Sequence, residues 1–412
     1  MTEARRRWLL FLLIVSGVLN YADRQIIAVL KPMLQLDLHW TDVEYGNITS
    51  LFQLATACAY LGAGRVVDRL GWKRANSWGV GTWSLAAMSH ALARTVAQFT
   101  AARIALGVTE AIGTPAAVKT VAVLFVARTR SVALGAMNAA SNLGAILTAL
   151  AVPPLALAAG WQPAFVVIGG LGLIWVLAWE WVTRRHEGLE LPAPSPQSGS
   201  TEHRERAAWG DVLRDRRTWA VIGAKMLSDQ VWWFLLFWIP DFFHAEFHLD
   251  MMQFAAPVAV IYAAAAAGSI IGGFASGRLI GRGRNPVAAR KLTMLVCALI
   301  VIPLPLALAT RSPWVAVALL SSTLAAHQGY AVNLFALATD ITPNERIGTL
   351  ISIAALCGNI AGIAILQAAG WLIGGGFGYL PLFLIAACSY LLGLLWLQLL
   401  LPRNTPALVE GL

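Results

Sequence analysis

The chain has 412 residues, of which 58% are hydrophobic and 12% are charged, with 30 Lys and Arg against 21 Asp and Glu and a formal net charge of +9. An ordinary soluble domain is about 25% charged, so this composition offers too little polar surface for an ordinary water-soluble enzyme. The basic residues lie in short loops between apolar segments, which indicates membrane topology rather than nucleic-acid binding.

Twelve apolar segments run along the chain, and most have about 20 residues, the length that spans a bilayer. They cover 8–30, 46–66, 76–94, 98–125, 132–157, 161–183, 217–240, 254–280, 291–309, 313–339, 347–373 and 377–401. A hydrophilic stretch separates the first six from the last six. We therefore expect an all-α polytopic membrane protein with twelve transmembrane helices in two pseudo-symmetric six-helix bundles, 1–183 and 217–412, joined by a central loop, 184–216.

The distribution of Lys and Arg sets the expected orientation. Twenty-three of them lie near the termini, in the central loop and in the other loops of that side, whereas the opposite side carries Lys31, Arg94 and Arg311. The positive-inside rule then places both termini and the central loop in the cytoplasm.

Two pairs of ionisable residues fall inside predicted spans. Asp23 and Arg24 are adjacent in the first span, and Arg103 and Glu110 lie seven residues apart in the fourth, on one helix face. Such a group costs at least ~2.5 kcal/mol in a spanning helix and usually faces a cavity or a partner. Near mid-membrane the Glu110 carboxyl favours its neutral form and can exchange protons, while Arg24 can bind an anion. The alternatives are an interfacial Asp23–Arg24 pair that fixes the helix end, and a structural ion pair of Glu110 with Arg103 or Lys119.

The seventh span carries Lys225 and Asp229 one helical turn apart, a spacing at which the two can neutralise each other. The tryptophans that follow are Trp232, Trp233 and Trp238. They suit either an interfacial belt or a flat apolar wall for a sugar ring. Uncharged polar residues of the fifth, tenth and eleventh spans are Asn138, Ser141, Asn142, His327, Gln328, Asn333 and Asn359. Helix-to-helix hydrogen bonding is their ordinary role, and with the charges they suit a polyhydroxylated anion.

Other chemistries have weak support. The sequence has no GxxxxGK[ST] motif, so ATP is not the expected energy source. His244 and His248 have a spacing that could bind a metal, but they lie in an outer loop, and we expect no metal site. The cysteines fall inside apolar runs and are expected to pack as small apolar residues rather than to form disulfides. They are Cys58, Cys297, Cys357 and Cys388.

The loop after the second span reads GRVVDRLGWKR from Gly64 to Arg74. It resembles the G-x-x-x-D-R-x-G-x-R/K-R/K signature of the major facilitator superfamily, and residues 273–278 look like a degenerate second copy. The resemblance implies a conformational role for the signature residues. These are Gly64, Asp68, Arg69, Gly71 and Arg74.

A narrower resemblance lies in N-Y-x-D-R of the first span and R-x-x-x-G-x-x-E-A-x-x-x-P of the fourth. Both motifs are similar to the anion:cation symporter family, and residues 228–240 and 326–335 resemble bacterial hexuronate transporters. The resemblance implies that Asp23 and Glu110 handle protons, that Arg103 tunes Glu110 and that Arg24 holds a substrate carboxylate. Substrate contacts are further expected from Tyr21, Tyr60, Asn138, Ser141, Asn142, Lys225, Trp233, His327, Gln328, Asn333 and Asn359.

The chain departs from those transporters at three positions. Gln230 stands where they usually have Pro, Asp241 follows Pro240 where Lys is common, and Thr56 stands where Tyr is frequent.

The resemblance implies proton-coupled symport of a hexuronate or related sugar acid by alternating access, in the bacterial cytoplasmic (inner) membrane. It implies no enzyme activity and no cofactor beyond the coupling proton. The expected partners are a small organic anion and the lipid bilayer, with no nucleic acid, and the expected state is a monomer. The alternatives are another organic anion, such as an aldonate or an aromatic carboxylate, and a membrane sensor that does not transport.

Overall fold

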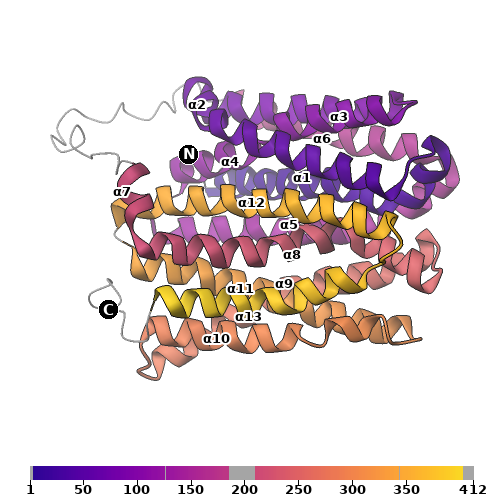
Figure 1. Cartoon of the computed structure of the whole chain (residues 1–412). Helices are drawn as coiled ribbons and strands as arrows, with labels where there is room; N and C mark the ends of the chain where they lie inside the picture. Colours follow the sequence, from indigo (N-terminus) through magenta and orange to yellow (C-terminus); the bar gives the residue numbers. More distant parts are fainter. Residues whose placement is uncertain (1–2, 126, 185–208, 343, 402–412) are drawn as a thin grey trace. The chain divides into compact units, whose positions relative to one another are not determined.

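The structure is a computed structural model that describes residues 3–125, 127–184, 209–342 and 344–401. Every regular element in these ranges is helical (Figure 1). The α-helices are α1 (Glu3–Leu38), α2 (Asp42–Ser89), α3 (Val96–Glu110), α4 (Gly113–Leu124), α5 (Ala127–Ala159), α6 (Trp161–Arg184), α7 (Trp209–Arg214), α8 (Arg216–Phe247), α9 (Met251–Gly281), α10 (Pro286–Val301), α11 (Pro313–Ile341), α12 (Asn344–Gly374) and α13 (Leu380–Leu400). Two 3-10 turns are η1 (His90–Leu92) and η2 (Leu304–Ala307).

The predicted all-α membrane fold is confirmed, with two differences in how the spans are built. The second and third predicted spans are the two arms of α2, which is kinked between them. The fourth is divided into α3 and α4 by a turn at Ala111 and Ile112. In the described residues, eight segments are long and apolar enough to cross a membrane by length and composition alone. The separate pieces α3 and α4, with 15 and 12 residues, are each too short for that criterion.

The kink in α2 is set by Gly71. This residue has φ 73° and ψ 162°, a backbone conformation that is open almost only to glycine. A Cβ built on Gly71 would meet no heavy atom within 4 Å, so the requirement for glycine comes from the backbone and not from crowding. The signature glycine therefore breaks the helix between two spans.

The helices group into two compact units. The first contains α1–α6 together with residues 236–259, which are the end of α8 and the start of α9. In it, α1 packs on α5 and α6, and α2 packs on α3, α4 and α6. The second contains α7, α8 up to Leu235 and the chain from Val260 onwards, with α11 packed on α10 and α12. The division into 1–183, 184–216 and 217–412 stays a prediction, and residues 185–208 of its central loop lie outside the described residues.

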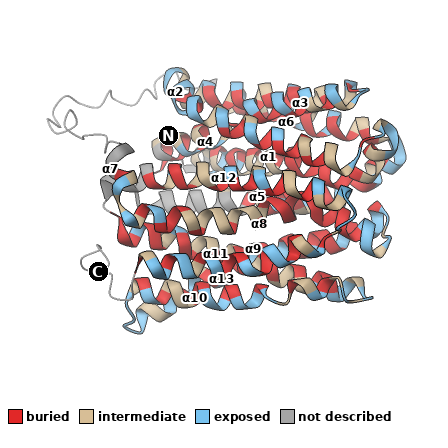
Figure 2. Cartoon of the chain, in the orientation of Figure 1, coloured by how far each residue is buried: buried red, intermediate tan, exposed pale blue. Residues whose placement is uncertain are grey.

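Large apolar side chains are exposed along the helices of both units (Figure 2). Leu177 of α6 is 71% exposed, and Ile270 of α9 is 74% exposed. Soluble monomers rarely expose large apolar patches, whereas lipid is a favourable solvent for such side chains. The exposed surface therefore agrees with a multi-pass membrane protein.

We predict that Gly71→Ala lowers the free energy of unfolding by about 1–3 kcal/mol, because alanine must adopt a strained backbone conformation. Gly62→Ala is the control, since Gly62 lies in the helical part of α2 with no heavy atom within 4 Å of its Cβ position. Thermal unfolding in detergent measures both. Equal melting temperatures for the two variants would contradict the assignment of the kink to Gly71.

Candidate functional site

A buried ion pair joins α1 to α3 in the first unit. The Arg24 Nε donates to the Glu110 Oε2 at 2.7 Å, and the two side chains are 8% and 0% exposed. Glu110 is the last residue of α3, directly before the turn that separates α3 from α4. Two residues that the sequence placed in separate spans and gave different roles are therefore in direct contact.

Arg103 enters the same cluster but binds backbone. Its Nη1 donates to the backbone carbonyl of Asp23 at 3.0 Å. Among the described residues, the Nε and Nη2 of Arg103 have no hydrogen-bond partner, whereas the Glu110 carboxyl also interacts with the Asn20 side chain. Asp23 is 2% exposed and interacts electrostatically with Glu110, Arg103 and Arg24. Buried polar atoms without partners are rare, which makes the unpaired donors of Arg103 candidate contacts for a ligand.

Aromatic rings cover both guanidinium groups. The Arg24 guanidinium carbon lies 5.5 Å from the centroid of Tyr21 and 5.7 Å from that of Phe52. The Arg103 guanidinium carbon lies 5.7 Å from the same Phe52 ring. Cation–π contacts of this kind partly replace the water that the two charges have lost.

Further residues expected at this site come from α2 and α5. The Tyr21 side chain hydrogen-bonds with Ser141 of α5 and interacts electrostatically with Tyr60 of α2. Asn142 is 6% exposed, and among the described residues its Oδ1 has no partner. Asn138 also lies on α5, but its side chain is outside what the structure describes. The structure thus brings Tyr21, Tyr60 and Ser141 together.

The charges of this cluster balance. Its members are Asp23, Arg24, Arg103 and Glu110. When all four are ionised, two positive and two negative charges are buried together with no net charge. A low-dielectric interior penalises any uncompensated charge strongly, so a further anion is acceptable only if one of the two carboxyls is neutralised.

A second cluster lies in the second unit, on α8. The Lys225 Nζ lies 2.6 Å from the Asp229 Oδ2 and 2.8 Å from its Oδ1, so the pair is self-neutralising. The ammonium group also lies 4.8 Å from the centroid of the Phe335 ring on α11. Lys225 and Asp229 therefore form the mutual ion pair that their spacing in the sequence allows.

An aromatic platform follows on the same helix. The Trp232 ring stacks on the His327 ring of α11, with centroids 5.3 Å apart and planes at 15°. The His327 Nδ1 lies 2.8 Å from the hydroxyl oxygen of Tyr390 on α13. Trp232 therefore packs inside the unit, and so does Trp233, which is 9% exposed and lies against Gly362 of α12. An interfacial tryptophan belt does not describe these two residues.

The amides of this unit have mixed roles. The Asn333 Nδ2 donates to the backbone carbonyls of Gly272 and Gly329, at 3.0 and 2.8 Å, and so ties α11 to α9. The Asn359 Nδ2 donates to the Ala355 carbonyl of its own helix at 3.0 Å. Gln328 is half-buried next to the platform histidine.

The signature segment forms a contact that the sequence did not predict. Lys119 of α4 lies 2.7 Å from the Asp68 Oδ1 of α2, so Lys119 is engaged here and is not the partner of Glu110. Arg69 and Arg74 are exposed. The signature carboxylate thus links the kinked part of α2 to α4.

Sequence reasoning missed a third charged cluster, formed by Lys31, Asp42 and Asp241. The first span was predicted to end at residue 30, so Lys31 was counted as a loop residue, whereas α1 continues to Leu38. Lys31 is 0% exposed. One signal in the sequence could have identified part of this cluster: Lys31 is followed closely by the acidic residues that begin the next helix, Asp42 and Glu44. Among the described residues, no group of three His, Cys, Asp or Glu is arranged to hold a metal ion, and the His244 Nδ1 lies 3.0 Å from the Leu249 carbonyl oxygen.

Comparison with known proteins adds independent findings. The sequence profile of the Major Facilitator Superfamily matches residues 13–366. The "Hexuronate transporter" of Escherichia coli (strain K12) is 28% identical, with 98% of this chain and 95% of that protein aligned. The "Probable L-galactonate transporter" of the same organism is 28% identical over 69% of this chain, and the aligned stretch spans 65% of that relative, less than two thirds of it.

A solved structure is similar over almost the whole chain. It is that of a bacterial homolog to the human lysosomal transporter Spinster, in an inward-facing and unoccupied conformation. The TM-score is 0.74 at 19% identity, with 97% of this chain and 96% of that chain covered. At this identity the likeness shows the fold alone.

We predict that Glu110→Ala lowers the free energy of unfolding by about 3–5 kcal/mol, because it leaves the Arg24 charge buried without its carboxylate. Glu110→Gln keeps an oxygen that can accept from the Arg24 Nε and loses less. Glu246→Ala is the control, since Glu246 is exposed on α8. Thermal unfolding in detergent compares the three, and an alanine variant at least as stable as the glutamine variant contradicts the pairing.

Proposed function

The chain belongs to the Major Facilitator Superfamily and is a membrane transporter, and we propose that it carries a hexuronate or related sugar acid together with a proton by alternating access. The observation that carries the proposal is the buried Arg24–Glu110 pair. One partner of this pair suits a substrate carboxylate, and the other is a carboxyl that can hold the coupling proton.

Competition for Arg24 provides the coupling. A planar guanidinium binds a carboxylate well, but Arg24 already donates to Glu110. When Glu110 takes up a proton it loses its charge and its hold on Arg24, and the substrate carboxylate replaces it. The cluster then returns to zero net charge with one proton and one monoanion bound. Substrate and proton therefore favour the same loaded state, which is the requirement for symport.

The remaining groups of the cluster have supporting roles. Arg103, held by the Asp23 carbonyl, places a second positive charge beside Glu110 and helps it to release the proton. Asp23 supplies the second carboxyl that keeps the resting cluster neutral.

The second unit offers chemistry that suits a sugar ring. Trp232 presents a large aromatic face stacked on His327, and the Tyr390 hydroxyl and the amides of Gln328 and Asn359 lie on the neighbouring helices. Aromatic faces pack against the C–H faces of sugars, and amides and hydroxyls bind their hydroxyl groups. The likeness to the hexuronate transporter supports a uronic acid, and that to the galactonate transporter supports an aldonate as the second candidate.

The proposed location is the cytoplasmic (inner) membrane of a bacterium, with both termini inside and the protein working as a monomer. The excess of Lys and Arg on the side of the termini supports this orientation. The carboxyl of Glu110, a group that can take up and release a proton, supports the proton as the coupling ion.

We predict that Glu110→Gln retains substrate exchange but loses uphill uptake, because the glutamine side chain mimics the protonated carboxyl and cannot release a proton. Proteoliposomes loaded with glucuronate measure exchange, and empty proteoliposomes with an imposed pH gradient measure accumulation. Normal accumulation by this variant removes Glu110 from the coupling mechanism. Absence of both activities in the wild-type protein with glucuronate and with galactonate would argue against the sugar-acid assignment.

We predict that Arg24→Ala weakens glucuronate binding by roughly ten- to hundredfold, since hydrogen bonds to charged groups contribute about 1.5–3 kcal/mol each. Arg24→Lys restores only part of the affinity, because it keeps the charge and loses the planar fork. Titration calorimetry of purified protein measures both variants, with glucose as the neutral control ligand. Equal wild-type affinity for glucose and glucuronate refutes a carboxylate site at Arg24.

A further inference from the structure

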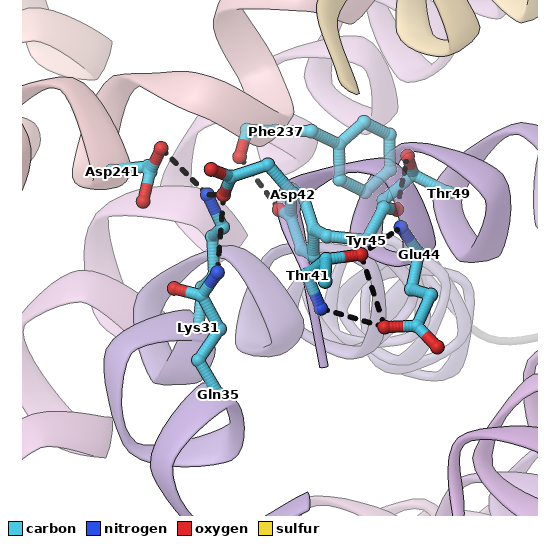
Figure 3. Close-up of polar contacts among 9 residues, drawn as sticks. All are labelled: Lys31, Gln35, Thr41, Asp42, Glu44, Tyr45, Thr49, Phe237 and Asp241. Atoms are coloured by element: carbon cyan, nitrogen blue, oxygen red, sulfur yellow. Dashed lines mark hydrogen bonds and ion pairs between the residues drawn. The ribbon is translucent and has the colours of Figure 1, made fainter. Parts of the chain in front are cut away.

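A buried ion cluster lies where α1 ends and α2 begins (Figure 3). The Lys31 Nζ lies 2.7 Å from the Asp42 Oδ1 and 2.6 Å from the Asp241 Oδ2. The Lys31 side chain is 1% exposed, and the two carboxylates are 29% and 7% exposed. The Gln35 Nε2 donates to the same Asp42 oxygen at 3.0 Å. None of these residues takes part in the cluster around Arg24.

Two of the three charged residues are held in place by local structure. Lys31 and Gln35 lie one turn apart on α1, and Asp42 is the first residue of α2. A capping box fixes that helix start, since the Thr41 hydroxyl accepts from the Glu44 N–H while the Thr41 N–H donates to the Glu44 carboxylate. Lys31 and Asp42 therefore stay together whatever the C-terminal helices do.

The third residue comes from a distant part of the chain. Asp241 lies on α8, and the Phe237 carbonyl one turn earlier accepts a hydrogen bond of 2.7 Å from the Tyr45 hydroxyl. The Trp238 ring covers the Lys31 ammonium at 4.3 Å and meets the Tyr45 ring edge-on, with centroids 5.0 Å apart. An ion pair, a hydrogen bond and a cation–π contact thus fasten the end of α8 to α1 and α2.

The fastened piece is the tip of a helical hairpin, residues 236–259, whose two helices continue into the second unit. Each helix contains a proline near the point where it leaves the first unit, Pro240 in α8 and Pro257 in α9. A proline inside a helix removes one backbone hydrogen bond and favours bending there. Any motion that separates α8 from α1 at this end must break the Lys31–Asp241 pair.

We propose that Lys31, Asp42 and Asp241 form an ion-pair latch that fastens the end of α8 to α1 and α2 and releases when α8 moves away from α1 during transport. The proposal rests on the alternating-access transport proposed above. Asp42 has a distinct task in the latch. When Asp241 moves away, Asp42 still neutralises the buried Lys31. Opening of the latch therefore leaves no uncompensated charge buried. Two carboxylates on one ammonium also repel each other, which keeps the closed latch reversible.

The test compares two charge-matched variants, Asp241→Asn and Asp42→Asn. Both remove one carboxylate from the same lysine, but only the first removes the link to α8. Spin labels at Leu36→Cys on α1 and Ala245→Cys on α8 report the separation, because both positions are exposed. The four native cysteines are first replaced by serine. Pulsed electron paramagnetic resonance in lipid nanodiscs then measures the distance distribution without any substrate.

The background protein carries the two label cysteines and no other substitution apart from the replaced native cysteines. For this protein the latch predicts one short label-to-label distance as the main population. Asp241→Asn raises the ratio of long to short distances about tenfold or more, and Asp42→Asn leaves it unchanged or lowers it. The swap Lys31→Asp with Asp241→Lys keeps two carboxylates and one ammonium and moves the ratio back towards the background value. An unchanged distribution in Asp241→Asn, equal shifts in both Asn variants, or a swap no closer to the background than Asp241→Asn overturns the latch.

The same measurement separates this inference from the proposed function. Because no substrate is added, failure of glucuronate or galactonate uptake leaves the distances readable. Conversely, normal uptake with an Asp241→Asn distribution identical to the background rejects the latch and leaves transport intact. Melting temperatures of all variants identify any that fold poorly, and for those the swap supplies the decisive comparison.

Discussion

Burial of charge in an apolar helical bundle is the constraint on which the rest of this structure depends. The Arg24–Glu110 pair is neutral in itself, Arg103 and Asp23 add one guanidinium and one carboxyl beside it, and the Tyr21 and Phe52 rings cover the Arg24 guanidinium. A cluster that tolerates neither an added nor a missing charge binds an anion only with a cation. In the proposed symport, coupling between substrate and proton follows from this electrostatic constraint.

The Lys31 cluster shows the same constraint used differently. Around Arg24 the numbers of cations and carboxylates are equal, which suits a site that exchanges one anion for another. Around Lys31 two carboxylates of the described residues contact one ammonium group, and one of them, Asp241, belongs to a helix that continues into the other unit. In the proposed latch, Asp42 keeps Lys31 neutralised when Asp241 moves away, so the contact with Asp241 can open and close repeatedly.

Much of the fold could be predicted from hydropathy, because spanning length and charge-poor composition leave few other structures for such a chain. The predicted span boundaries that differ from the observed helices have local causes. The two predicted spans on either side of the kink at Gly71 form one long helix, α2, and the turn after Glu110 divides another span into α3 and α4. Hydropathy predicts neither feature. Lys31 was misplaced because an apolar run ends at a charged residue even when the helix continues, here to Leu38.

The site was predictable as a set of residues but not as a set of contacts. Charges inside spans identify Arg24, Arg103 and Glu110, since each is expensive there without a role. Helical periodicity placed Arg103 and Glu110 on one face, but it could not show that Glu110 pairs with Arg24 while Arg103 binds the Asp23 carbonyl. Pairings between helices depend on how the helices pack. The ion pair of Asp241 with Lys31 could not be predicted, because the sequence does not show that the end of α8 packs against α1.

The central claim is that the Arg24 cluster binds one proton for each monoanionic substrate, so that transport moves no net charge. The most direct test measures glucuronate accumulation in proteoliposomes while the membrane potential is set with valinomycin and potassium gradients at a fixed pH gradient. The charge balance predicts accumulation that follows the pH gradient and stays the same across imposed potentials. Accumulation driven by an inside-negative potential at equal pH on both sides would contradict it, because it requires more than one proton per substrate.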